Sequence, residues 1–301
     1  MSRTVVLVGV SLTLSSIVIA APQAQPQANP APRTVYVTVT DRNGVPVGNL
    51  TAADFAVKEG GKTARVLQAA LATEPLQIAL IVDDNGTGLF RAALARFVQR
   101  MDGHAAMSLS SVVGQTMKIV DYTTSAPAVM QGVATLNARP GTPDGGQLLE
   151  GIADAAIELD RREARRPVII ALTVGGEEHS TANADHVLDQ LRKSGAILHV
   201  FSVIRSALRS TVAAQRPSAL LQENLNLQKV LGDGPRQSGG RHLEIAPAAG
   251  RLEDLQQLAS ELLQQYRVSY ALPPGTKASD RLAVSVTRKG MSVRAPTRIG
   301  N

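Results

Sequence analysis

The chain of 301 residues contains no cysteine. Structural disulfides, thiolate metal ligands, a cysteine nucleophile and lipidation of a cysteine are therefore excluded. Aromatic residues are also few, with four Tyr, four Phe and no Trp, and the net charge is a moderate +6. Proteins that bind single-stranded nucleic acid interleave aromatic side chains with basic ones. We therefore predict no nucleic-acid partner.

Sequence motifs of common catalytic sites are also missing. We find neither the Gly-x-Ser-x-Gly elbow of α/β-hydrolases nor the His-Glu-x-x-His pair of zinc peptidases. Gly61-Lys62-Thr63 looks like the end of a phosphate-binding loop, but the first glycine of that motif would fall on Ala56. Gly86-Thr87-Gly88 matches two glycines of a dinucleotide-binding motif, but the third falls on Arg91. We therefore predict no catalytic residue and no cofactor.

The five histidines are scattered along the chain. His179 follows Glu177-Glu178, and His186 lies about two helical turns later. A cluster of Glu177, His179 and His186 would be the basis of one alternative function, an exported hydrolase. A hydrated loop is the simpler interpretation of the same residues.

The first twenty residues have the composition of a secretory signal peptide. Arg3 gives a positive start, residues 4–19 are apolar or small, and Val18-Ile19-Ala20 offers a cleavage site. A retained membrane anchor is the alternative, but five Ser or Thr residues interrupt the run, which is short against the roughly 20 apolar residues of a span. Residues 21–33 form a leader rich in Pro, Ala and Gln. We predict a secreted or periplasmic protein without a membrane span after signal removal.

Both ends of the remaining chain have the alternating pattern of β-strands. Residues 34–40, 55–59 and 64–67 predict three strands in an N-terminal β unit, 34–72, and Thr51 is the expected N-cap of a single helical turn. Residues 266–270, 282–287 and 291–294 predict three more in the C-terminal segment 266–301. We expect the two groups to meet in one flanking, β-sandwich-like unit.

Between residues 73 and 265, apolar runs alternate with stretches that have helical spacing. The predicted strands cover 76–83, 105–113, 117–124, 167–172, 197–203 and 242–245. The first predicted helix carries Phe90, Leu94, Phe97 and Val98 at helical spacing, and further helices are predicted at 147–160, 184–193 and 251–265. This alternation favours an α/β fold with a doubly wound, mostly parallel sheet. The pattern fades at residues 206–240, for which we predict a surface insertion with one short helix near 220–230.

The run 76–82 stops abruptly at a polar loop, residues 83–88. Ligands of parallel sheets bind outside the carboxyl ends of the strands, so we expect a site here. The frame Asp83-x-Asn85-x-Thr87 resembles the Asp-x-Ser-x-Ser loop of von Willebrand factor A (VWA) domains. Further segments support a resemblance to VWA-related proteins of the acidobacterial type: Val39-Thr40-Asp41-x-x-Gly44-x-Pro46-Val47, Leu50-Thr51-x-x-Asp54-Phe55, Val168-Ile169-Ile170-Ala171-Leu172-Thr173, Ser238-Gly239-Gly240-Arg241 and Tyr266-Arg267-Val268-Ser269-Tyr270.

The resemblance implies a Rossmann-like fold and a divalent cation held by three loops. The family's second loop reads Gly-Gly-Thr and its third Thr-Asp-Gly, whereas this chain has Gly145-Gly146-Gln147 and Thr173-Val174-Gly175. A threonine hydroxyl and an aspartate are thus replaced, and Mg²⁺ tolerates little departure from octahedral oxygen ligation. We predict a degenerate site without a functional metal, for which Asp83, Asn85 and Thr87 are the residual ligand candidates.

We therefore expect an exported, non-enzymatic interaction or adhesion module that binds a protein or cell-surface partner. The expected binding face is formed by the loops at the carboxyl edge, with the side chains of Asp84, Asp144, Gln147, Glu177 and Glu178. The alternative is a cation-dependent adhesion domain in which Mg²⁺ or Ca²⁺ occupies an altered site. The hydrolase is the second alternative.

Overall fold

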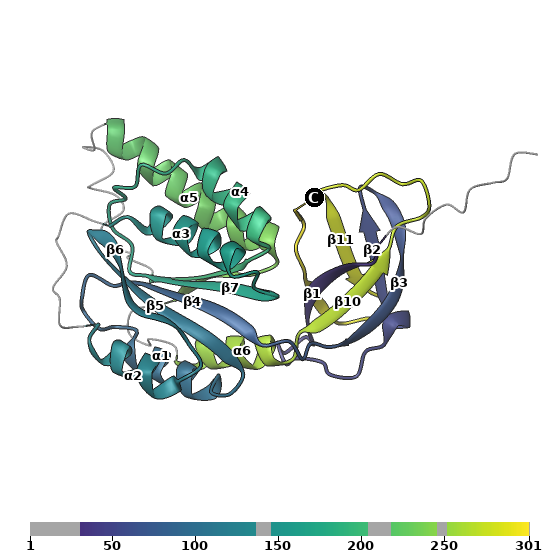
Figure 1. Cartoon of the computed structure of the whole chain (residues 1–301), viewed down its shortest axis with the longest axis horizontal. Helices are drawn as coiled ribbons and strands as arrows, with labels where there is room; N and C mark the ends of the chain where they lie inside the picture. Colours follow the sequence, from purple (N-terminus) through teal and green to yellow (C-terminus); the bar gives the residue numbers. More distant parts are fainter. Residues whose placement is uncertain (1–30, 137–145, 204–217, 246–251, 301) are drawn as a thin grey trace, which may run out of the picture.

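Two six-stranded β-sheets lie side by side along the molecule (Figure 1). The computed structural model describes residues 31–136, 146–203, 218–245 and 252–300. One sheet is mostly parallel and carries helices on both faces, and the other is antiparallel.

The mostly parallel sheet has the strand order β6-β5-β4-β7-β8-β9. Its strands are β4 (Leu76–Asp83), β5 (Ala105–Val113), β6 (Gln115–Thr123), β7 (Arg166–Thr173), β8 (Ile197–Val203) and β9 (His242–Ile245). Only β6 runs antiparallel to its neighbour. The chain starts at the centre, builds one edge and then returns to build the other, which is the doubly wound arrangement. The predicted fold class is confirmed.

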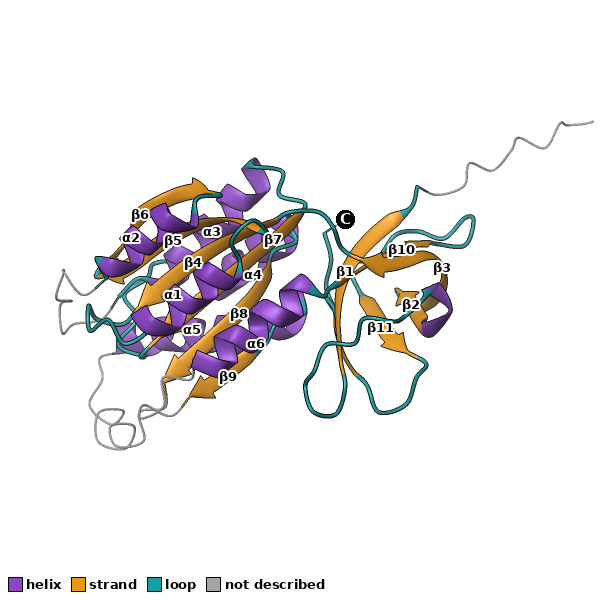
Figure 2. Cartoon of the chain, turned by 90° about the horizontal axis from the view of Figure 1, so that it is seen from below, coloured by secondary structure: helices purple, strands orange, loops and turns teal. Residues whose placement is uncertain are grey.

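Helices form a layer on each face of this sheet (Figures 1 and 2). One layer contains α1 (Arg91–Arg100), α2 (Ala126–Ala134) and α6 (Leu252–Leu263), and the other contains α3 (Leu148–Arg161), α4 (Ala184–Ser194) and α5 (Ser218–Ser238). Every residue of β7 is buried. Alternate residues of that strand enter opposite cores, Ile170 on one side and Ile169 on the other. This double burial explains why residues 167–172 of the strand form one continuous apolar run.

Helix α5 corrects the prediction for residues 206–240. The described part is not a surface insertion with a short helix but a 21-residue helix that packs on α4 and β8. In the sequence this helix comes between β8 and β9. Gly234 allows this packing, because a Cβ at that position would lie 2.8 Å from a methyl carbon of Leu198. Glycine and Pro235 inside the helix are residues typical of loops, which is why the helical pattern was missed.

The antiparallel sheet combines strands from both ends of the chain. Its order is β11-β2-β3-β10-β1-β12, with β1 (Arg33–Thr40), β2 (Phe55–Glu59), β3 (Lys62–Leu71), β10 (Tyr266–Ala271), β11 (Leu282–Val286) and β12 (Ser292–Arg294). An isolated β-bridge pairs Arg281, just before β11, with Arg298, a few residues after β12. Because β11 and β12 are the two edge strands, this pairing shows that the sheet curls back on itself. Its inner face encloses a separate core that includes Val37, Val57 and Tyr266.

A buried arginine connects the two units. Arg166, at the start of β7, is 5% exposed and donates hydrogen bonds to the carbonyl oxygen of Glu74 (2.9 Å), the carbonyl oxygen of Leu262 (2.6 Å) and the side chain of Gln265 (3.1 Å). Its guanidinium also lies 5.5 Å from the ring centroid of Tyr36 in the other sheet. Glu74 and Gln265 belong to the two segments through which the chain passes between the sheets, so one side chain holds both crossings.

A buried ion-pair network makes a second connection. Glu261 on α6 is 1% exposed, and its carboxylate accepts hydrogen bonds from Arg241, at 3.2 Å, and from Arg294 on β12. Burial lowers the pKa of Arg241, and the negative charge of Glu261 opposes that shift. The carboxylate thus joins α6 to an edge strand of the antiparallel sheet.

We expect Arg166→Met to destabilise the protein strongly. The substitution leaves buried carbonyl oxygens without donors, at a cost of about 3 kcal/mol. The thermal midpoint of the full chain, followed by circular dichroism, should fall by about 6–12 °C. Arg165→Met is the matched control, because Arg165 is the exposed neighbour of the same residue type. Equal midpoints for the two variants would contradict the assigned role of Arg166.

Candidate functional site

The candidate site lies where the strand order of the parallel sheet reverses, between β4 and β7. The chain leaves β4 toward α1 on one face and leaves β7 toward α4 on the other, so the two loops diverge at this point. Asp83 and Thr173 are the paired last residues of these strands. The topology therefore places Asp83 at the position where parallel sheets bind ligands.

Asp83 is held by the neighbouring strand. The Thr173 hydroxyl donates a hydrogen bond to Asp83 Oδ2 at 2.6 Å, and the backbone N–H of Gly175 donates to that hydroxyl at 2.9 Å. The backbone N–H of Val174 also donates to the carbonyl oxygen of Asp83 at 2.9 Å. One carboxylate oxygen of Asp83 is thus used to fix the third loop.

The first loop is closed by its own polar groups. Asp84 is 1% exposed, and its Oδ1 accepts a hydrogen bond from the backbone N–H of Gly86 at 3.1 Å. The Thr87 hydroxyl donates to the carbonyl oxygen of Asp84 at 2.8 Å, and Asn85 has a left-handed backbone with φ 55°. Burial raises the pKa of Asp84, although the backbone N–H of Gly86 counteracts the shift. The loop is a tight turn around an inward-facing carboxyl group.

The second loop is joined to the segment after β7. The backbone N–H of Gly146 donates to the carbonyl oxygen of Glu177 at 3.0 Å, and the N–H of His179 donates to the carbonyl oxygen of Gly146 at 2.9 Å. A Cβ on Gly146 would lie 3.6 Å from Asp83 Oδ1. The second and third loops therefore meet beside Asp83, as parallel strands ending at one edge require.

Glu178 is the buried centre of this junction. Its side chain accepts hydrogen bonds from the backbone N–H of Leu149, at 3.2 Å in the first turn of α3, and from the Ser180 hydroxyl. The pKa of Glu178 is raised to about 7, mainly by burial and also by the charges of Asp83 and Glu150, although the two hydrogen bonds oppose the shift. The carboxyl group titrates near neutral pH while it holds the start of a helix.

The structure changes the expected binding face. Asp84 and Glu178 were expected on the exposed binding face, but they are only 1% and 2% exposed. Their buried side chains hold the loops in place and do not reach solvent. Gln147, the N-cap of α3, and Glu177 are partly exposed at the edge. Asp144 lies outside the described residues. Whether this face binds a partner stays a prediction.

Sequence reasoning missed two hydroxyl groups that organise the site. Thr173 is the last residue of a buried strand, and that position is the signal by which the sequence could have identified it. Ser180 donates to the Glu178 side chain from two residues away. Its burial, at 1% exposed, is a tertiary property that the polar sequence around it does not indicate.

The residues of the hydrolase alternative do not form one constellation. His179 Nε2 lies 4.0 Å from Glu177 Oε2, beyond hydrogen-bond distance. His186 is exposed on α4. Among the described residues, no nucleophile is hydrogen-bonded to either histidine.

The divalent cation implied by the resemblance does not fit this site. Val174 stands where the third loop would supply an aspartate, and it is 6% exposed and packed in the core. Gln147 begins α3, and Asp83 Oδ2 already accepts the Thr173 hydroxyl. Within the described part of the chain, no three His, Cys, Asp or Glu residues are grouped to hold a metal. Mg²⁺ demands oxygen ligands in near-octahedral geometry, and the apolar side chain of Val174 supplies no oxygen.

We expect Glu178 to make unfolding depend on pH. Its folded-state pKa of about 7 is above the unfolded value of 4.5, so the stability it contributes is full below pH 4.5 and is lost as pH rises through 7. Glu178→Gln stays neutral and should remove this loss, which amounts to about 3 kcal/mol. Thermal midpoints at pH 4 and pH 8 measure the difference.

Glu177→Gln is the matched control, since Glu177 is the partly exposed neighbour and should leave the pH dependence of the wild type unchanged. Identical pH dependence in wild type and Glu178→Gln would show that the carboxyl group is not buried in the folded protein.

Comparisons with known proteins identify no match by sequence, either to a family model or to a curated protein. Solved structures are similar at low identity. Proximal thread matrix protein 1 of the mussel byssus, described with a zinc-occupied MIDAS motif, is 16% identical with a TM-score of 0.45. The alignment covers 69% of this chain and 50% of that protein, so this chain matches about half the length of the mussel protein.

Two further structures are domains named after von Willebrand factor. The vWF domain of the type V pili tip protein Mfa5 from Porphyromonas gingivalis is 11% identical over 62% of this chain and 95% of its own, with a TM-score of 0.45. The von Willebrand factor type A protein from Catenulispora acidiphila is 13% identical over 92% and 75%, also at 0.45. These scores carry no functional argument. Two of these three similar structures are thus named as von Willebrand factor domains, one of them of type A.

Proposed function

We propose that the chain is an exported interaction module of the VWA type that binds a protein or cell-surface partner through the carboxyl-edge loops. Binding requires neither a bridging cation nor catalysis. The strand order, the switch-point position of Asp83 and the meeting of three loops there support this proposal. Among the described residues, no helix has both the length and the apolar character needed to cross a membrane.

The main support for the proposal is that polar side chains at the carboxyl edge of the parallel sheet form hydrogen bonds within the protein. Asp83 binds Thr173, Asp84 binds its own turn, and Glu178 binds the start of α3. These contacts hold the loops in one arrangement and so lower the entropic cost of binding a partner. The groups left for contact are on the outside of the loops, where Thr87 is exposed and Leu89 is 38% exposed.

We expect divalent cations to leave the thermal midpoint of the full chain unchanged. Melts with chelator and with millimolar Mg²⁺, Ca²⁺ or Mn²⁺ measure this, because a cation at 100 times its Kd would add about 2.7 kcal/mol. Asp83→Asn keeps an oxygen acceptor for Thr173 and removes the charge. A cation-dependent rise in wild type that Asp83→Asn abolishes would replace this proposal with the cation-dependent adhesion domain.

We expect Leu89→Asp to weaken partner binding at least tenfold, since it places a charge in the apolar part of the face. The measurement is retention of envelope and extracellular proteins on the immobilised full chain, followed by titration of the retained partner. Leu221→Asp on α5 is the matched control, because Leu221 is also an exposed leucine but lies outside the face.

Equal retention by the Leu89→Asp and Leu221→Asp variants would place the binding surface elsewhere. Turnover of an ester, glycoside or peptide substrate that His179→Ala abolishes, with an unchanged thermal midpoint, would support the exported hydrolase instead.

A further inference from the structure

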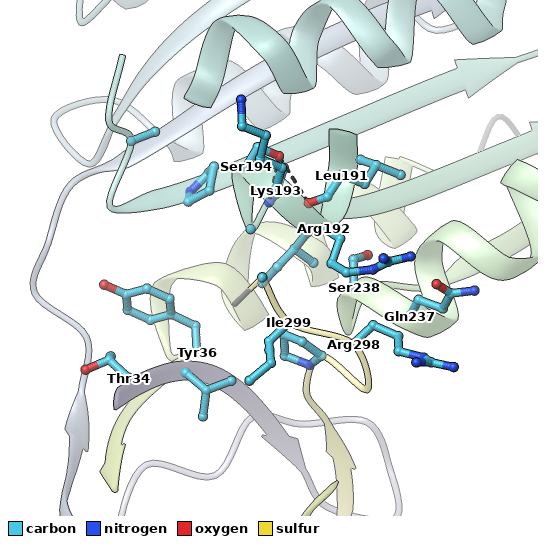
Figure 3. Close-up of a pocket in the computed structure, with 18 of the residues that line it drawn as sticks. Thr34, Tyr36, Leu191, Arg192, Lys193, Ser194, Gln237, Ser238, Arg298 and Ile299 are labelled. Atoms are coloured by element: carbon cyan, nitrogen blue, oxygen red, sulfur yellow. Dashed lines mark hydrogen bonds between the residues drawn. The ribbon is translucent and has the colours of Figure 1, made fainter. Parts of the chain in front are cut away.

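A cavity of about 460 Å³ lies between the two units, at the opposite end of the parallel sheet from the candidate site (Figure 3). Pro167 and Ile197, near the amino ends of β7 and β8, line one side of it. Residues of β1 and the C-terminal segment 296–300 line the other. The volume is within the range of about 300–1,000 Å³ that is usual for small-molecule sites.

Apolar residues from both units line this cavity. Leu188 and Leu191 belong to α4, and Ile299 belongs to the C-terminal segment of the antiparallel unit. The two walls come close at their rim, because a Cβ on Gly300 would lie 3.1 Å from the carbonyl oxygen of Arg192. A ligand in this cleft would therefore bury an apolar body against both units at once.

The charged residues that line the cavity all carry the same sign. No aspartate or glutamate is among the lining residues, and the cations are Arg33, Arg165, Arg192, Lys193 and Arg298. Cations are favoured in the last turn of a helix, but only Arg192 and Lys193 occupy such a position. The remaining three come from a strand, a loop and the C-terminal segment, so the helix dipole does not account for the cluster.

Four of these cations have carboxylate partners, and those partners lie outside the lining. Arg192 pairs with Asp189 at 3.0 Å, and Lys193 pairs with Asp160 at 3.0 Å. Arg298 pairs with Asp280, and Arg33 pairs at 3.3 Å with the buried Glu59. Arg165 has no ion-pair partner within the described part of the chain. One positive charge is thus uncompensated.

A ligand carboxylate can replace the present carboxylate partners of Arg192 and Arg298. Asp189 and Asp280 have side chains that are 63% and 36% exposed, and exposed ion pairs contribute little to stability. Arg192 Nε is buried and has no hydrogen-bond partner among the described residues. Figure 3 shows Arg192 on the wall formed by the end of α4 and Arg298 on the wall formed by the C-terminal segment.

We propose that this interdomain cleft binds a small organic monocarboxylate with an apolar body. The guanidinium groups of Arg192 and Arg298 bind the carboxylate from opposite walls, with the planar geometry that suits it. The apolar lining holds the rest of the ligand. Because the ligand contacts both units, its binding stabilises their arrangement.

Calorimetric titration of the full chain with octanoate tests this proposal. We expect saturable binding to wild type that weakens at least tenfold in Arg192→Gln and in Arg298→Gln. Arg100→Gln is the matched control, because Arg100 is a cation in the last turn of α1 on the other face of the sheet. Octan-1-ol and inorganic phosphate, which carry the apolar body or the charge alone, should bind at least tenfold more weakly than octanoate.

The position of the octanoate site is tested in the wild-type protein, so that a variant that fails to fold cannot decide the result. Octanoate should slow amide hydrogen exchange at the start of β8 and in residues 296–300. Asp83→Asn should leave octanoate binding unchanged, which separates this site from the proposed partner-binding face. The proposal is overturned by absent octanoate binding, by equal binding of octan-1-ol or phosphate, by unchanged affinity in both arginine variants, or by protection elsewhere.

Discussion

The arrangement of the two units depends on one buried guanidinium. The chain passes between the sheets twice, after β3 and after α6, and Arg166 donates hydrogen bonds to both crossing segments. Backbone carbonyl oxygens at such crossings have no partner within either sheet, and leaving them unpaired in the interior is costly. A further bond between the backbone N–H of Ala72 and the carbonyl oxygen of Gln265, at 2.8 Å, ties the crossings to each other. The cleft between the units exists because these contacts hold its walls.

The two ends of the parallel sheet carry opposite chemistry. At the carboxyl end, the acidic groups Asp83, Asp84 and Glu178 are turned inward and hold loops. At the amino end, cations such as Arg192 and Arg298 surround an apolar cavity. The inward-facing carboxyl groups hold the loops in one arrangement, which suits binding of a macromolecule. The cations can exchange their carboxylate partners and surround an apolar cavity, which suits binding of a small anion. The same fold therefore supports two separate proposals.

Much of the fold could be predicted from the sequence, since burial leaves a pattern that can be read directly. Strands such as 76–83 and 166–173 are covered on both faces, and each therefore contains a continuous apolar run, 78–82 and 167–172. Two helices had a weaker signal or none. Only residues near 220–230 of α5 were predicted as helical, because Gly234 and Pro235 interrupt the pattern, and α2, which begins at the Ser125 cap with proline in its first turn, was not predicted. Tertiary contacts with Leu198 and with β5 and β6 decide both helices.

The sequence alone determined that residues 83–88 follow a buried strand and that the third loop lacks its aspartate, because both are properties of local composition. It also determined the apolar alternation that builds two sheets. Only the tertiary structure decided which polar groups reach solvent. Asp84 and Glu178 are adjacent to partly exposed residues in the chain, yet they are buried because residues distant in sequence cover them. The sequence did not indicate the cationic cleft either, since Arg192 and Arg298 are brought to one cavity only when the ends of the chain fold against α4.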